Sequence, residues 1–213
     1  MIKVKDRSFI SYIEDNPNEL TKTQMERIFE DIDNPRGSTM YDETFDFMQW
    51  LHGRPGRQEL FYEYIKKNYT NFFGKRVLEV GCGPRARLSK MLSRSFKMTA
   101  MDPSLDPDLR IKHVKLIRKI FKYNTPIDNF DLVIGLEPCD ATEEIIRNCL
   151  ANNKEFIVVL CGTPHKCMQD GITPKTAYEW YKYLLEIDPN YLQLRKLELN
   201  EFTAYAIMNK RDN

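Results

Sequence analysis

Two closely spaced glycines follow a short apolar run, and this spacing can bring the backbone against a ligand. Residues 77–80 form the run, Glu79 stands inside it, and Gly81 and Gly83 come directly after it. Glycine has no Cβ, so the chain can turn tightly there and approach a bound molecule closely. A carboxylate within a buried strand is costly without a partner. These positions predict a ligand-binding turn at the end of a buried strand.

A second acid follows the next apolar run at a suitable distance from this turn. Asp102 ends the run 97–101 and precedes Pro103. In open α/β sheets, a carboxylate at about this separation from a glycine turn binds ribose hydroxyls. A third apolar run begins at Phe130. The ordered set predicts a site for a nucleoside-containing cofactor. The competing interpretations are an Asp-Pro turn at Asp102 and an ion-paired strand end at Glu79.

Together these segments resemble class I S-adenosylmethionine-dependent methyltransferases. The family's first motif has an acid, one further residue and a glycine turn, and Glu79 to Gly83 are similar to it. Residues 100–104 are similar to the end of the family's second strand. Residues 130–134 are similar to the strand that leads to the substrate side. The resemblance extends from residue 58 to the C-terminus and implies S-adenosylmethionine as cofactor. It implies that Glu79 supports the methionine end and that Asp102 binds the ribose. The full set of implied cofactor contacts is Glu79, Gly81, Cys82, Gly83, Asp102 and Pro103.

Arg85 departs from the family pattern, which commonly has a third glycine at that place. If the turn requires a positive φ there, either Arg85 is strained or the register of the turn is shifted. Either outcome affects the expected affinity for the cofactor.

The loops after the next two apolar runs are expected to line the methyl-acceptor side. Residues 135–143 and 158–165 follow strands whose carboxyl ends would lie beside the cofactor. The first segment resembles a loop of a poorly characterised methyltransferase-like group, with Glu137 in place of that group's histidine. We expect Glu137 to act as a base or to orient the acceptor. Cys139, Asp140 and His165 complete the candidate set.

Two other functions stay open on the sequence. The pattern Gly81-x-Gly83-x-x-Ala86 also satisfies the dinucleotide-binding fingerprint, which would indicate an NAD-dependent oxidoreductase. The position of Glu79 and the terminal strand pair favour the methyltransferase interpretation. The third possibility is a non-catalytic or degenerate cofactor-binding module.

Strands that alternate with helices predict an α/β fold. We expect a doubly wound, mostly parallel seven-stranded sheet with an antiparallel C-terminal hairpin. Residues 1–57 have helical spacing without strand alternation and predict a helical cap or arm, and 58–213 predict a Rossmann-like domain. Strands are expected at 76–80, 97–101, 130–136, 156–161, 191–199 and 203–208, and helices at 58–69, 86–96, 143–151 and 176–187; residues 111–122 suit either.

Composition narrows the possible partners. The 213 residues hold 32 basic and 31 acidic side chains, a formal net charge of +1. This balance favours a small-molecule acceptor over nucleic acid or an anionic membrane. Five cysteines without a Cys-x-x-Cys pair and three scattered histidines predict no metal site. No apolar stretch suits a signal sequence or a membrane span, so we expect a cytoplasmic protein. The acceptor itself and a homodimer stay open.

Overall fold

The computed structural model describes residues 53–161, 168–199 and 202–210. The chain divides into two compact units, Met1–Arg57 and Gln58–Asn213. Most of the first unit, and with it the predicted helical cap, lies outside the described residues. No helix within the described ranges has the length and apolar character needed to cross a bilayer.

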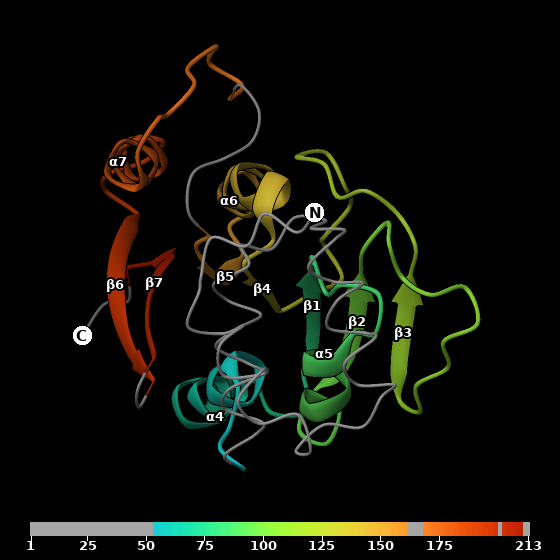
Figure 1. The fold of residues 1–213 in the computed structure, drawn as a ribbon. Helices are drawn as coiled ribbons and strands as arrows, with labels where there is room; N and C mark the ends of the chain where they lie inside the picture. Colours follow the sequence, from blue (N-terminus) through green and yellow to red (C-terminus); the bar gives the residue numbers. More distant parts are fainter. Residues whose placement is uncertain (1–52, 162–167, 200–201, 211–213) are drawn as a thin grey trace, which may run out of the picture. The chain divides into compact units, whose positions relative to one another are not determined.

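A seven-stranded sheet forms the second unit, in the order β3-β2-β1-β4-β5-β7-β6 (Figure 1). Neighbouring strands from β3 to β5 run parallel, whereas β7 pairs antiparallel with both β5 and β6. The predicted doubly wound, mostly parallel sheet with an antiparallel C-terminal hairpin is therefore confirmed. The strands are β1 Arg76–Val80, β2 Lys97–Met101, β3 Val114–Ile117, β4 Leu132–Leu136, β5 Glu155–Val159, β6 Leu192–Leu199 and β7 Phe202–Asn209.

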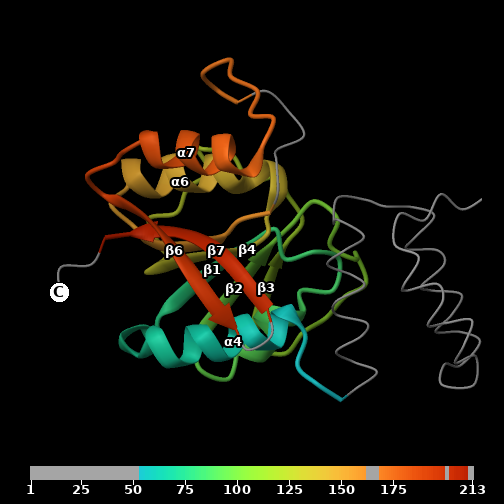
Figure 2. The ribbon, with the colours of Figure 1, turned by 60° about the vertical axis from the view of Figure 1, so that its left-hand side comes forward.

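Helices cover both faces of this sheet (Figures 1 and 2). One face carries α4 (Arg57–Asn68) and α5 (Arg87–Leu92), and the other carries α6 (Thr142–Ala151) and α7 (Ala177–Glu186). Two short 3-10 helices, η1 (Thr70–Phe72) and η2 (Cys139–Ala141), lie before β1 and after β4.

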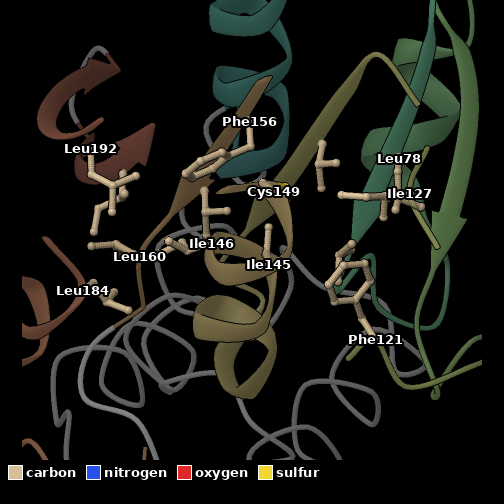
Figure 3. Close-up of a cluster of buried hydrophobic side chains, with 14 of the residues drawn as sticks. Leu78, Phe121, Ile127, Ile145, Ile146, Cys149, Phe156, Leu160, Leu184 and Leu192 are labelled. Atoms are coloured by element: carbon tan, nitrogen blue, oxygen red, sulfur yellow. The ribbon is translucent and has the colours of Figure 1, made fainter. Parts of the chain in front are cut away.

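The larger part of the core lies between the sheet and α6 with α7 (Figure 3). Leu78, Val133 and Phe156 stand side by side on adjacent strands and are fully buried. Ile145 and Ile146 of α6 belong to the same cluster. Apolar side chains of parallel strands are buried because helices cover both faces. The packing fixes the strand ends at which ligands bind in such sheets.

Several expected elements differ from the prediction in extent or type, and two of them differ most clearly. The helix expected over 86–96 ends at Leu92, because Ser93 begins a turn and its hydroxyl donates to the Lys90 carbonyl at 2.8 Å. Phe96 is buried instead beside Phe73, with ring centroids 5.3 Å apart. The ambiguous segment 111–122 contains the short strand β3, paired in parallel with β2.

Candidate functional site

The glycine turn lies at the point where the strand order reverses, since β1 has β2 on one side and β4 on the other. Gly81 has φ +73°, and a Cβ there would lie 2.7 Å from both Cα and Cβ of Pro138. Its N–H donates to the Met101 carbonyl at 3.0 Å. The β4 loop therefore packs directly on Gly81, and any larger residue must displace it.

Gly83 differs from Gly81 in what surrounds it. Its φ is +66°, but a Cβ at this position would meet nothing within 4 Å. Its N–H donates to Oδ2 of Asp102 at 2.9 Å. The second glycine thus leaves an open space beside the carboxylate at the end of β2.

Asp102 is held in one orientation at the tip of β2. Its Oδ1 accepts from the backbone N–H of Ser104 at 2.7 Å and from the Ser104 hydroxyl at 2.6 Å. A carboxylate oxygen can accept about two hydrogen bonds, so Oδ2, which accepts one from Gly83, retains acceptor capacity for a hydroxyl group. The exposed Pro103 contributes its carbonyl to Arg118 Nε at 3.3 Å. The competing turn interpretation of Asp102 describes its contacts with Ser104 but not the contact with Gly83.

In the turn after Gly83, the left-handed backbone conformation falls on Ala86 and not on Arg85. Arg85 is exposed and does not adopt a positive φ, whereas Ala86 does, at 43°. Ala86 is fully buried and packs with Cys82 and Leu105 in a small cluster. The left-handed position is therefore shifted by one residue, and a small side chain carries its strain.

The side chains of Glu79 and Cys82 are both buried. The Glu79 carboxylate is buried, at 3% exposure, and accepts a hydrogen bond from the Ser89 hydroxyl of α5. Burial, with a smaller contribution from Asp102, raises the pKa of Glu79 to about 7, and the Ser89 hydrogen bond opposes this. Cys82 is buried in the small cluster with Ala86, and burial raises the pKa of its thiol. Because the Cys82 side chain is buried, only its backbone could contact a ligand.

The β4 loop carries two further strained residues at the same sheet edge. Glu137 and Cys139 have φ values of 52° and 47°, uncommon for residues with a Cβ. The N–H of Glu137 donates to the Val159 carbonyl at 3.0 Å, and the Cys139 thiol donates to the Glu137 carbonyl at 3.4 Å. Such strain concentrates at functional sites. Asp140 is exposed in η2, and His165 lies outside the described residues.

Cys161 brings the end of β5 to this loop. The hydrogen bond with the Cys139 thiol, burial and the nearby Glu137 all raise the pKa of the Cys161 thiol. Burial, followed by Cys161, also raises the pKa of Tyr181, whose ring lies 5.7 Å from that of Tyr205. A protonated thiol is a weak nucleophile, so we do not expect Cys161 to act as a thiolate. The tyrosines come from α7 and β7, and no sequence spacing indicated them.

Glu143, in the first turn of α6, is the centre of a buried hydrogen-bond network. Glu143 is buried and accepts from Arg147 Nε at 2.8 Å and from the Tyr183 hydroxyl at 2.7 Å. Arg147 also pairs with Asp170 at 2.9 Å. The network links α6 to α7 through Tyr183 and to the segment before α7 through Asp170.

Tyr183→Phe is expected to lower the free energy of unfolding by about 1–2 kcal/mol, because Glu143 loses a donor inside the protein. Urea unfolding measures the change. Tyr178→Phe is the matched control, since Tyr178 lies on the same helix and is 76% exposed. Equal losses in the two variants would contradict the role of the network.

Within the described ranges, no group of three or more His, Cys, Asp or Glu residues could hold a metal ion. Neither a protein-family model nor a curated protein matches this chain. Among solved structures, similar ones include a candidate S-adenosyl-L-methionine-dependent methyltransferase of Methanococcus maripaludis, with a TM-score of 0.49 and 15% identity, over 72% of this chain and 85% of that one. A SAM-dependent methyltransferase of Leishmania major has a TM-score of 0.49 and 14% identity, over 71% and 70%. At this level of similarity the neighbours do not transfer an activity to this chain.

Proposed function

We propose that this chain is an S-adenosylmethionine-dependent methyltransferase whose cofactor lies across the glycine turn and Asp102. The observation that carries the proposal is the 2.9 Å hydrogen bond from Gly83 N–H to Asp102, with open space beside Gly83. A ribose fits this arrangement, because the fixed carboxylate can accept from its hydroxyls and no Cβ blocks the approach. The location at the switch point of the sheet supports the same placement.

The strand order also favours this function over an NAD-dependent oxidoreductase. The dinucleotide fold commonly has the order 3-2-1-4-5-6 without an inserted strand. Here β7 is inserted antiparallel between β5 and β6. The antiparallel terminal hairpin that the resemblance to methyltransferases implies has this form. The dinucleotide-binding pattern at Gly81 to Ala86 implies no such hairpin.

The acceptor side is proposed to lie along the β4 and β5 loops. When bound, the cofactor supplies a methyl group on a sulfonium, which is transferred in line to a nucleophile. The chain then has mainly to align the acceptor and exclude water. Glu137 is half-buried beside Cys139 and Cys161 and is proposed to orient the acceptor or take its proton. Asp140 and His165 remain candidates for the same side, and a small-molecule acceptor fits the near-neutral chain better than nucleic acid.

Melting with S-adenosylhomocysteine, S-adenosylmethionine and NAD tests the proposal, because a ligand that binds only the native state stabilises it. We expect both sulfur compounds to raise the melting temperature and NAD to leave it unchanged. A shift with NAD alone would establish the oxidoreductase alternative, and no shift with any of them would favour the module without cofactor.

Asp102→Asn is expected to weaken binding of S-adenosylhomocysteine about tenfold or more, because a hydrogen bond to a charged group is lost. Calorimetric titration measures the change. Asp106→Asn is the matched control: Asp106 is exposed in the same loop, and its carboxylate accepts only the Asp108 N–H, at 2.8 Å, among the described contacts. Unchanged affinity in the folded Asp102→Asn variant would contradict the ribose role.

A further inference from the structure

Among the residues that the structure describes, no helix lies over the amino-terminal end of the face of β1, β2 and β3 on the α6 side. Residues 118–131, which connect β3 to β4, contain no helix. The strand register places Thr99 beside Leu78, which belongs to the core under α6. Two residues earlier along the same strands, Arg76 lies beside Lys97, and their side chains share this face. On the next strand, Lys115 lies beside Thr99. In Figure 1, α6 and α7 lie over the part of the sheet away from β3.

A hollow of about 490 Å³ opens at the amino-terminal end of these strands. Arg76, Lys97 and Lys115 line it, together with His113. All four are exposed, and His113 has a φ of 65°. Within the described residues, none of the three permanent cations forms an ion pair. The neighbouring acid Asp131 accepts the backbone N–H of Arg76 at 2.8 Å. Adjacent strands lie about 5 Å apart, so these exposed cations lie near enough to one another to attract an anion together.

Phe130 gives the hollow an apolar surface and is half-buried. Phe96 and Met98 also line the hollow, but each is only 3% exposed, and alternation along β2 directs the Met98 side chain to the α5 face. Pockets for small molecules in proteins measure about 300–1,000 Å³ and combine apolar walls with a few polar groups. The combination suits a ligand with a phosphate at one end and a flat ring at the other.

We propose that this hollow binds a nucleoside phosphate, with the phosphate on Lys97 and Lys115 and the base against Phe130. Arg76 adds a bidentate donor for phosphate oxygens. A nucleic-acid strand or an anionic membrane fits less well, because each calls for an extended basic surface and the chain's net charge is +1. The hollow lies at the opposite end of β1 from the glycine turn, roughly 13 Å away along the strand. The proposal is therefore independent of methyl transfer.

Calorimetric titration of the full chain with ADP tests this site. We expect saturable binding that Lys97→Glu and Lys115→Glu each weaken about tenfold or more. Lys67→Glu is the control with the same charge change, because Lys67 is exposed on α4 and does not line the hollow. Saturating S-adenosylhomocysteine is expected to leave ADP affinity unchanged. If a charge reversal prevents folding, the double variant Lys97→Gln with Lys115→Gln replaces it and must weaken ADP binding to the same extent.

Several outcomes would overturn the proposal. One is the absence of ADP binding to the unaltered chain, and another is equal affinity for ADP and inorganic phosphate, which indicates an adventitious anion contact. Binding of ADP that survives every substitution in the hollow would place the nucleotide elsewhere. Binding of an RNA oligonucleotide or of phosphatidylserine vesicles through Lys97 and Lys115, without binding of ADP, would assign the cations to a macromolecular surface instead.

Discussion

Gly81→Ala is expected to lower the free energy of unfolding by about 3 kcal/mol, and Gly83→Ala by only about 1 kcal/mol. Both substitutions force alanine into a left-handed conformation, which costs about 1–2 kcal/mol. Gly81→Ala adds a Cβ 2.7 Å from two atoms of Pro138, and overpacking of this kind costs a further 1–3 kcal/mol or so. At Gly83 the added Cβ meets open space. Urea unfolding of the two variants measures the difference.

For ligand affinity we expect Gly83→Ala to have the large effect, although its effect on stability is the smaller of the two. The Cβ of Gly83→Ala enters the space in which we propose the cofactor lies, beside Asp102. We therefore expect this variant to bind S-adenosylhomocysteine at least about tenfold more weakly while it stays nearly as stable as the unaltered chain. Equal destabilisation by the two alanines would contradict the packing of Pro138 on Gly81. Unchanged affinity in folded Gly83→Ala would contradict the position proposed for the cofactor.

Gly81 and Gly83 also show which features of the site could be predicted from the sequence and which could not. The bounds of β1 and β2 were predicted correctly because glycine and an Asp-Pro step end each apolar run. The need for glycine at position 81 was predicted from its type, but its cause is Pro138, which is distant in the sequence and close only in the folded chain. Ser89, the partner of Glu79, lies on the next helix without any distinguishing signal.

Residues under backbone strain were the least predictable part of the candidate site. Ala86, Glu137 and Cys139 adopt positive φ values although none is glycine or asparagine. The family pattern left two possibilities at Arg85, a strained long side chain or a shifted register of the turn. The register is shifted, and the chain bears the strain at buried Ala86, packed with Leu105, because tertiary packing overrides local preference. The end of α5 was missed for a related reason, since Phe96 packs beside Phe73 rather than extending the helix.

Glu79 is expected to make the stability of the folded chain depend on pH. Its pKa is about 7 in the folded protein, against an ordinary value of 4.5. Between these values the folded state binds more protons than the unfolded state, so the contribution of Glu79 is fully present below about pH 4.5 and declines as the pH rises to about 7. The shift corresponds to about 3 kcal/mol, because one pKa unit is worth about 1.4 kcal/mol. The cause is burial, which penalises the charged carboxylate.

Glu79→Gln removes this titration. Relative to that variant, the unaltered chain should lose about 3 kcal/mol of unfolding free energy between pH 4.5 and pH 8, with most of the loss below pH 7. Urea unfolding of both proteins at several pH values measures the difference. Glu63→Gln, at an exposed position of α4, should leave the pH dependence unchanged. Ser89→Ala should extend the decline to higher pH, because the Ser89 hydrogen bond lowers the pKa of Glu79. A constant difference between the unaltered chain and Glu79→Gln over this range would mean that Glu79 is ionised in the folded protein, which its burial between β1 and α5 argues against.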